Sequence, residues 1–447
     1  MKKTWGKCCA ASMTGLVAVA SAAGAPHAED RFSVLYTFEV ADPSTGASPL
    51  GSQPDTRPAL GPHDSVFGMT YTGGANGNGV IYRYDLKTHS YRLMHTFGAL
   101  DANGTNQDGA NPGVALTRGP DDAFYGVAQY GGKNGTGTVF KITAAGDFTV
   151  LHAFGALDSA AHNEDGANPL RTVIFGENGN LYGTTRLGGE NTCGTAPAVN
   201  SCGVAWVMHP SGSNFRVLHQ FTPSEGHAAS LTWSRDGFLY GCAVWPRPAL
   251  GSGILYRMAP SGSQFEVLHR FSAVNSEGYN SDGAECFEPL IETERGVFYG
   301  SAYYGGSNGN GVVFRFHSSG GTHLQIIHTF SATNASGDNW DGANPYARLA
   351  PGRDGWLYST ASYGGKFGDG VVYRLRHQGE FEVLHTFSAV DPTTGSNVDG
   401  ADPDYGVVLD EDEDRLIGIA DYGGAGSVAG STGNGTLYEI KLRHRRW

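Results

Sequence analysis

Short apolar runs alternate with glycine-rich polar stretches along the whole chain, and one apolar run keeps returning. A string like Val-Leu-His-Thr-Phe, followed by a polar loop, occurs seven times, first as Val34-Leu35-Tyr36-Thr37-Phe38. Its closing phenylalanines lie 59, 57, 67, 50, 59 and 57 residues apart, at Phe38, Phe97, Phe154, Phe221, Phe271, Phe330 and Phe387. A repeat of this length indicates that the chain consists of copies of one supersecondary unit.

Each copy contains four strand-like segments, as the sixth copy illustrates. Its segments 346–351, 356–361, 371–375 and 381–387 are rich in β-branched and aromatic residues, and glycine-containing turns separate them. Glycine makes up 67 of the 447 residues, and it falls at fixed places between these segments. We therefore predict one four-stranded antiparallel sheet per copy.

The two ends of the repeat array predict how the copies assemble. The array begins with 32–38, a fourth strand without the first three, and ends with 405–409, 416–420 and 435–442, three strands without a fourth. Pairing these segments completes a seventh unit and removes the free edges of an open array. We predict an all-β fold, a seven-bladed β-propeller of four-stranded blades, in which the N-terminal strand closes the last blade of a single domain, 29–442.

The N-terminal segment has the pattern of a secretion signal. Three lysines within the first seven residues precede a small-residue apolar stretch, 10–25, which is too short for a membrane-spanning helix. We expect 1–28 to be a signal peptide; the alternative is an N-terminus without signal function. Residues 443–447 read as a basic C-terminal tail. A cleaved signal predicts that the protein is secreted or periplasmic.

Charge narrows the expected partners. Without the three signal lysines, the chain has 27 basic and 43 acidic residues, a net charge of −16. A surface of this sign repels nucleic acid and anionic membranes. We therefore expect no nucleic acid and no membrane as partner, and we expect a monomer.

The repeat resembles a known family. The motifs Asp-Gly-x-Leu-Tyr-Gly-x-Thr, Gly-Gly-x-x-Gly-x-Gly-x-Val-Tyr-Arg and Phe-x-Val-Leu-His-x-Phe follow one another, with good copies at 181–185, 363–374 and 381–387. They are similar to the GloVer (Gloeo/Verruco) tandem repeat of secreted bacterial proteins. The resemblance covers nearly the whole mature chain and implies an extracellular propeller. It implies no particular activity and no catalytic residue set.

Polar loops recur between the fourth and first strands. They carry Asn-x-Asp-Gly-Ala motifs whose aspartates are Asp108, Asp165, Asp282, Asp341 and Asp399. Alternating carboxylate and amide oxygens suit Ca²⁺, which is the one cofactor the sequence suggests. We favour tight turns instead, because aspartate or asparagine before glycine caps a turn and no loop has the bidentate glutamate of a calcium loop.

One histidine per copy also recurs on the predicted outermost strand. The set is His95, His152, His219, His269, His328 and His385. The count suggests a metal site, but one histidine per blade places these side chains far apart around the ring. We expect them to be structural and to hydrogen-bond toward the neighbouring blade.

Four cysteines remain in the mature chain, an even number that suits an oxidising compartment. Cys193 and Cys202 flank an insertion in blade three, and we expect them to form a disulfide; the alternative is two free thiols. Cys242 and Cys286 fall on adjacent blades, so a second disulfide is expected between them.

Blades three, four and five depart most from the repeat, and a symmetric ring needs such asymmetry to build one active site. Their loops lie on the face that carries the long fourth-to-first and second-to-third loops, where we expect a groove. We assign catalytic roles to four candidate residues, and these are His227, Arg247, Arg186 and Tyr304. We assign substrate binding to five others, and these are His162, Trp245, Glu285, Glu288 and Tyr303. The alternative is that these departures from the repeat arose by neutral sequence change and that the residues are ordinary surface residues without a functional role.

Two functions fit this set. The first is a carbohydrate-active enzyme that acts on extracellular polysaccharide, and a polysaccharide lyase is more plausible than a glycoside hydrolase. In a lyase, an arginine would neutralise a uronate carboxylate while His227 or a tyrosine takes the C5 proton. A glycosidase needs two carboxylates about 5–10 Å apart, and Glu285 with Glu288 is the conspicuous pair. The second is a non-catalytic module that binds glycans or cell-wall polymer through tyrosine-rich loops. The sequence alone leaves open whether the protein is an enzyme.

Overall fold

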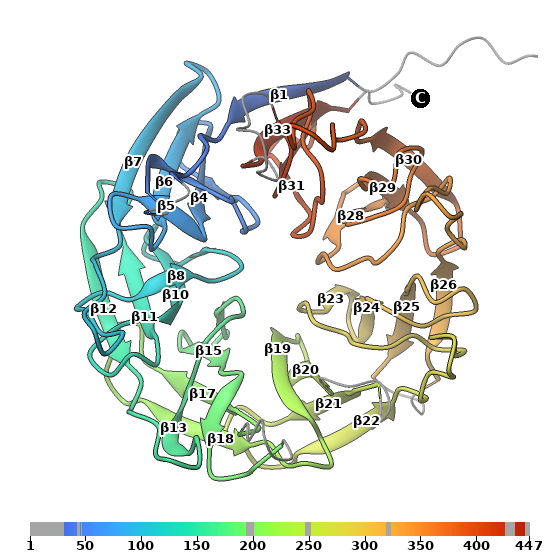
Figure 1. Cartoon of the computed structure of the whole chain (residues 1–447). Coiled ribbons are helices and arrows are strands. Elements are labelled where there is room, and N and C mark those ends of the chain that lie inside the picture. Colours follow the sequence, from blue (N-terminus) through green and yellow to red (C-terminus); the bar gives the residue numbers. More distant parts are fainter. Residues whose placement is uncertain are drawn as a thin grey trace, which may run out of the picture.

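The computed structural model describes residues 31–42, 45, 47–193, 201–245, 252–318, 323–424 and 434–442. These residues form strands and loops without any helix, and seven antiparallel sheets stand around a central channel (Figure 1). The predicted seven-bladed β-propeller is therefore confirmed. Because the described residues include no helix, none of them forms a helix that could span a membrane.

The strands run from the channel outwards in each blade. Blade one contains β3 (Ala59–Gly61), β4 (Ser65–Thr70), β6 (Val80–Asp85) and β7 (Ser90–Thr96), and blade two contains β8 (Ala110–Pro112), β9 (Thr117–Arg118), β10 (Phe124–Tyr130), β11 (Thr138–Ile142) and β12 (Phe148–Ala153). Blade three contains β14 (Ile174–Phe175), β15 (Leu181–Thr184), β17 (Val204–Met208) and β18 (Arg216–Gln220). Blade four contains β19 (His227–Trp233), β20 (Leu239–Val244), β21 (Ile254–Met258) and β22 (Glu266–Arg270). Blade five contains β23 (Ile291–Glu294), β24 (Val297–Ala302), β25 (Val312–His317) and β26 (Gln325–Thr329), and blade six contains β27 (Ala350–Pro351), β28 (Leu357–Ala361), β29 (Val371–Leu375) and β30 (Phe381–Thr386). Blade seven contains β31 (Val407–Leu409), β32 (Arg415–Ala420), β33 (Thr436–Lys441) and β1 (Arg31–Thr37).

The first strand of the chain closes the ring as predicted. β1 pairs antiparallel with β33, from Arg31 opposite Lys441 to Thr37 opposite Thr436. The amide of Phe38 extends the ladder by donating to the carbonyl of Gly435 at 3.1 Å. Closure leaves β33 without a free edge, which is how propellers avoid strand-to-strand association.

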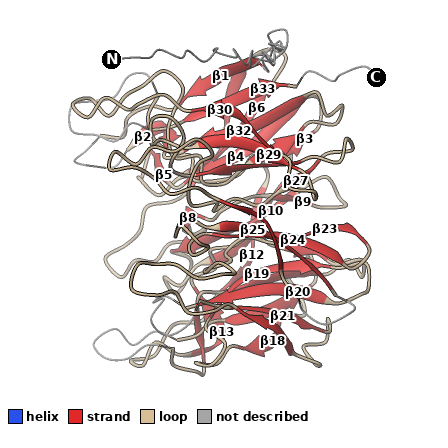
Figure 2. Ribbon diagram, turned by 90° about the vertical axis from the view of Figure 1, so that its right-hand side faces the viewer, coloured by secondary structure: helices blue, strands red, loops and turns tan. Residues whose placement is uncertain are grey.

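The long loops gather on one face of the ring. Two extra two-stranded pairs form there, β2 (Ser48–Ser52) with β5 (Thr72–Gly74), and β13 (Asn163–Ala167) with β16 (Leu187–Gly189). Each pair joins a fourth-to-first loop to the second-to-third loop of the following blade. In the edge-on view the longer loops project from one side of the molecule (Figure 2). We call this side the long-loop face.

The core lies between neighbouring blades. Phe67 of blade one stacks on Phe124 of blade two, with ring centroids 4.1 Å apart, and both side chains are fully buried. Buried clusters of this kind combine residues of two adjacent sheets, for example Tyr240 of blade four with Phe298 of blade five. Each buried aromatic side chain contributes about 1.5–3 kcal/mol of hydrophobic stabilisation.

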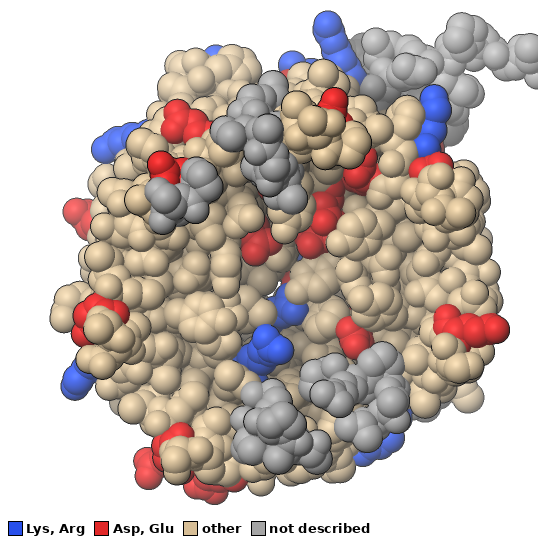
Figure 3. Space-filling view, viewed as in Figure 1, with Lys and Arg blue, Asp and Glu red and all other residues tan. Residues whose placement is uncertain are grey.

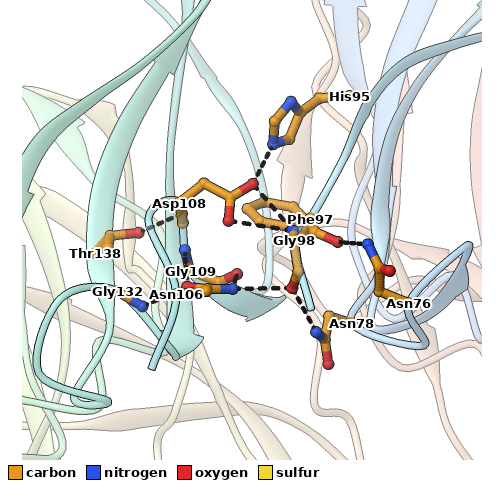
Figure 4. A network of polar contacts seen from close by, with 10 residues as sticks. All are labelled: Asn76, Asn78, His95, Phe97, Gly98, Asn106, Asp108, Gly109, Gly132 and Thr138. Carbon is orange, nitrogen blue, oxygen red and sulfur yellow. Dashed lines mark hydrogen bonds and ion pairs between the residues drawn. The ribbon is translucent and has the colours of Figure 1, made fainter. Parts of the chain in front are cut away.

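The repeated histidines and aspartates form a hydrogen-bond network that links blades (Figure 4). The Nε2 atom of His95 lies 2.9 Å from Asp108, whose carboxylate also accepts from the amide of Gly98 at 3.1 Å. The imidazole stacks on Phe148 of the next blade at 3.8 Å. Asn106 closes the turn, because its side chain donates to the carbonyls of Gly98 and Gly109.

The same contacts recur around the ring, with Glu225 in place of aspartate in blade four, and they join His152–Asp165, His219–Glu225, His269–Asp282, His328–Asp341 and His385–Asp399. Protein donors thus bond the carboxylates that could have bound calcium. Among the described residues, no group of three or more His, Cys, Asp or Glu side chains is placed to hold a metal ion. The histidines are structural, as expected.

Both predicted disulfides are present. Cys193 bonds to Cys202 within the blade-three loop, and Cys242 of β20 bonds to Cys286 at the start of blade five. The second bridge joins two blades, so its prediction depended on first inferring that blades four and five are neighbours in the ring. Two disulfides fit an oxidising compartment. The predicted signal peptide and the basic tail lie outside the described residues.

Candidate functional site

A cavity of about 330 Å³ opens at the predicted place, where blades three, four and five meet the central channel. We call it the first cavity. It is lined by Leu170, Arg171, Thr184, Arg186, His227, Ala228, Ala229, Val244, Trp245, Glu285, Phe287 and Tyr346. Four of the predicted site residues are among these, so the asymmetric blades do build one concave site.

His227 starts β19, and its side chain is buried, with 4% of its surface exposed. Its Nδ1 lies 3.2 Å from the carbonyl oxygen of Arg186. A carbonyl only accepts, so Nδ1 carries the proton and Nε2 carries a lone pair. Nε2 is buried without a hydrogen-bond partner in the described structure. Burial, aided by the charge of Arg186, lowers the pKa of His227 below its ordinary 6.5. The neutral imidazole therefore offers a free base.

Glu285 occupies a position of the repeat that holds asparagine in blades two, three and six. Its φ of 61° is left-handed, as are those of Asn111, Asn168 and Asn344 at the equivalent positions. Asparagine tolerates this conformation better than most residues, and its amide donates to a neighbouring carbonyl, as Asn344 does to Tyr303. Glutamate has no amide, and only its protonated form has a donor. Burial raises the pKa of Glu285 to about 7, so the carboxyl group is protonated below neutral pH and about half protonated at pH 7.

Arg171 forms the wall of the first cavity nearest the channel. Its Nη1 donates to Glu288 at 2.9 Å, and its guanidinium lies over the rings of Phe287 and Tyr346 at 5.0 and 5.1 Å. Burial alone lowers the pKa of Arg171, but Tyr346 and Glu288 outweigh it and the net shift is upward. The cation is thus permanent and rigidly held. Removing Glu288 would leave it uncompensated, which typically costs about 3–5 kcal/mol.

Arg186 and Trp245 complete the polar and aromatic lining of the first cavity. Arg186 follows β15, its side chain is exposed, and no carboxylate of the described residues pairs with it. It can therefore meet an anionic ligand without breaking an existing ion pair. Trp245 follows β20 and is half-buried, so its ring offers a face for stacking on an apolar surface such as a sugar ring.

The other predicted site residues lie elsewhere. Tyr303 and Tyr304 are not among the lining residues of the first cavity, and their rings meet edge to face with centroids 4.4 Å apart. Burial, then the carboxyl group of Glu285, raises the pKa of Tyr304. Glu288 is buried beneath the cavity as the partner of Arg171. His162 lies apart and hydrogen-bonds to Thr192 at 2.9 Å. Arg247 lies outside the described residues.

Sequence reasoning missed a second group, on the opposite side of the channel. Four aspartates of blades one and seven meet there, and these are Asp55, Asp402, Asp404 and Asp421. We call them the aspartate cluster. Burial, then Asp404, raises the pKa of Asp402 to about 9, and burial raises the pKa of Asp404 to about 6. Acidic and basic side chains thus gather on different sides of the central opening (Figure 3).

A signal for these residues exists in the repeat. The positions that follow the Asn-Pro pair or its equivalent hold charged residues in several copies, and these are Asp55, Arg57, Arg171, Glu288, Arg348 and Asp404. Arg57 and Arg348 lie close together; burial, then the charge of Arg57, lowers the pKa of Arg348 to about 9. Aligning the copies shows these charges at three successive positions, with Asp55 and Asp404 at the first, Arg171 and Glu288 at the second, and Arg57 and Arg348 at the third.

Comparison with solved structures shows which known proteins share this fold. An oligogalacturonate lyase from Vibrio parahaemolyticus is 12% identical, with a TM-score of 0.50 over 93% of this chain and 97% of the lyase. A puromycin-hydrolysing peptidase from Mycobacterium tuberculosis is 11% identical, with a TM-score of 0.51 over 86% of this chain and 52% of the peptidase. At these identities the likeness shows the fold alone.

Sequence comparison shows the family. No curated protein matches the chain. The model of the Gloeobacter/Verrucomicrobia repeat matches twice, over residues 24–197 and 196–428, which together span most of the sequence. The protein belongs to the Gloeobacter/Verrucomicrobia repeat family.

Proposed function

We propose that the protein is a secreted carbohydrate-active enzyme that cleaves a uronate-containing polysaccharide by β-elimination in the first cavity. One observation carries this proposal: a single cavity is lined by a neutral histidine with a free Nε2, a carboxyl group whose pKa is raised to about 7, and two arginines. Titratable groups with pKa values displaced toward neutrality are typical of acid–base catalysis.

The reaction divides between these groups. Nε2 of His227 takes the C5 proton of the uronate, and the electron pair of the broken C–H bond forms the C4–C5 double bond. The bond from C4 to the glycosidic oxygen breaks, and Glu285 gives its proton to the departing oxygen. One product carries the unsaturated uronate at its new non-reducing end, and the other carries the protonated oxygen as a new reducing end; no oxidant or water is consumed. Groups placed as general base and general acid each contribute about 10²–10⁴-fold.

The arginines prepare the substrate for proton loss. A C5 proton beside an ionised carboxylate is a very weak acid, and neutralising the carboxylate stabilises the charge that develops on proton removal. Arg186 is free to form a two-pronged contact with a carboxylate. Arg171, fixed by Glu288, keeps a positive potential at the cavity wall. Trp245 can stack on the sugar ring.

Two further observations support this choice of reaction. The disulfides fit a protein that works outside the cytoplasm, where polysaccharides are found. One similar solved structure is an oligogalacturonate lyase. That protein shares only the fold, so it supports testing elimination first but assigns no residue here.

A glycan-binding module without catalysis is the second candidate, favoured by exposed aromatic rings. Their exposed fractions run from 40% to 62%, for Tyr130, Tyr304, Phe367, Tyr363 and Trp340. Aromatic faces of this kind bind sugars by stacking without any chemistry.

A screen of purified protein against uronate-containing and neutral polysaccharides separates the two functions. Elimination produces a conjugated product that absorbs in the ultraviolet, and hydrolysis does not. We expect absorbance to rise with at least one uronate polymer. Binding of a polymer without absorbance and without new reducing ends would favour the module.

A further inference from the structure

Charged side chains from four blades meet at the centre of the ring. Nη1 of Arg171 in blade three donates to Glu288 in blade five at 2.9 Å. These two blades are not neighbours, so their side chains can meet only where all seven blades converge. Arg57 of blade one and Arg348 of blade six lie one position further along the same segment of the repeat, and the charge of Glu288 acts on both. Basic side chains are visible in the central opening (Figure 3). We call Arg57 and Arg348 the arginine pair.

Neither member of the arginine pair has a partner. Both residues are half-buried, and among the described residues neither side chain forms an ion pair, a hydrogen bond or a contact with an aromatic ring. Nε of Arg348 is buried and has no hydrogen-bond acceptor in the described structure. A buried donor without an acceptor is unfavourable, and a buried cation without a counter-charge is more so. The pair therefore lacks an acceptor that the described protein does not supply.

The two guanidinium groups also repel each other. Burial, then the charge of Arg57, lowers the pKa of Arg348 to about 9. Burial lowers the pKa of Arg57 as well, and the charge of Glu288 opposes this shift. Arg348 is still positive at pH 7.5, because its pKa lies above that value, and an arginine such as Arg57 also stays protonated there. Folding thus places two like charges side by side, and stability alone does not account for them.

One carboxylate cannot balance three arginines. Glu288 is the one carboxylate among the described residues whose charge shifts the pKa of the arginine pair, and its Oε1 already accepts from Arg171. The nearby aspartates do not take its place, because Asp55 and Asp404 act on Arg171. The arginine pair, Arg171 and Glu288 together leave two positive charges at the centre of the ring. This excess attracts an anion that carries two negative charges.

We propose that the arginine pair binds a small oxyanion with two negative charges, of the class of phosphate and sulfate, either free or carried as an ester on a sugar. Planar guanidinium groups present forked N–H donors that match the oxygens of such anions. The dianion supplies the acceptor that Nε of Arg348 lacks, and it balances both excess charges. A single carboxylate balances only one of them, and a metal cation is repelled. The site is separate from the first cavity, whose lining includes neither Arg57 nor Arg348.

Calorimetric titration of the purified full chain with sodium phosphate at pH 7.5, in a chloride buffer, tests this directly. We expect one phosphate per chain, and binding at least tenfold weaker in Arg348→Gln and in Arg57→Gln. Arg92→Gln is the matched control, because Arg92 is exposed on β7, and it should bind phosphate like the natural chain. Glucose 6-phosphate is titrated in parallel, with glucose as its neutral counterpart. Tighter binding of the ester than of phosphate would identify a sugar-borne oxyanion, and weaker binding would identify a free one.

Thermal unfolding separates binding from a purely structural role. Phosphate should raise the melting temperature of the natural chain more than sodium chloride of equal ionic strength does, and Arg348→Gln should lose this difference. Without phosphate, Arg348→Gln should melt no lower than the natural chain, because it loses an unpartnered cation; Arg57→Gln carries the test if that variant does not fold. Equal effects of phosphate and chloride, unchanged phosphate binding in the variants, or no binding would each overturn the proposal. No polysaccharide is used, so the outcome is independent of the proposed elimination.

Discussion

The imidazole of His227 donates from Nδ1 to the carbonyl oxygen of Arg186, at 3.2 Å, across the boundary between blades four and three. This one contact fixes the tautomer, because a carbonyl cannot donate. It turns Nε2 into the unprotonated nitrogen and leaves the Arg186 guanidinium free for a ligand. The base and the cation of the proposed reaction are therefore positioned by each other.

The activity should have a narrow, bell-shaped dependence on pH. His227 must be neutral, so kcat/KM rises as pH rises through its lowered pKa, below 6.5. Glu285 must be protonated, so kcat/KM falls as pH rises through about 7. Arg171, whose pKa is raised by Tyr346 and Glu288 against the effect of burial, stays positive throughout this range. Measuring kcat/KM from pH 4 to pH 9 checks this, and Glu285→Gln should lower the maximum and remove the alkaline limb.

Glu285 should also make stability depend on pH, whether or not a substrate is known. Its folded-state pKa of about 7 exceeds its ordinary 4.5, so the folded state holds the proton more tightly. The free energy of unfolding therefore falls as pH rises from about 4.5 to about 7, by up to about 3 kcal/mol. Denaturant unfolding at pH 5 and pH 8 should show Glu285→Gln gaining stability over the natural chain at pH 8. An equal difference at both pH values would contradict the buried, protonated carboxyl.

The two disulfides should contribute unequally. They close loops of 9 and 44 residues. The chain-entropy model gives about 2.6 kcal/mol for the short loop and about 4 kcal/mol for the long one. Replacing Cys242 and Cys286 with serine should thus lower the free energy of unfolding more than replacing Cys193 and Cys202. The opposite order in denaturant unfolding would show that the bridge between blades four and five is not a major constraint.

Deleting residues 31–38 should open the ring. The deletion removes β1 and the stacking of Phe32 on His385 at 3.7 Å, and it leaves β33 as a free edge. We expect a lower melting temperature and association through the exposed edge. Arg31→Ala is the control, because Arg31 is exposed and its backbone ladder persists. An unchanged melting temperature of the deletion variant would contradict closure by β1.

Much of the fold could be predicted from the repeat. Seven copies, each too small to bury both of its faces, require neighbours, and the unmatched strands at the two ends show how the ring closes. The second disulfide followed from the adjacency of blades four and five. His227, Arg186, Trp245 and Glu285 were found because they break the repeat.

The remaining site residues could not be found this way, because their role depends on closure. Asp55 and Asp404 are far apart in sequence, and only the ring brings blade one beside blade seven. Arg171 lies in the segment before β14, and in the sequence it resembles an ordinary strand residue, so only the structure shows its place beside Glu288 and Tyr346. His162 deviates from the repeat as strongly as His227, but its loop turns it toward Thr192. A departure from the repeat shows that a position is unusual, but only the folded structure shows which site its side chain faces.

The most direct test compares His227→Ala with Tyr130→Ala on any polysaccharide that the natural protein cleaves. Tyr130 is exposed on the long-loop face in blade two, away from the first cavity. Loss of the base should lower kcat/KM by about 10²-fold or more, while Tyr130→Ala should change it only a few-fold. Circular dichroism confirms that both variants fold. Comparable losses for the two variants would contradict catalysis by His227 and indicate a diffuse glycan-binding face.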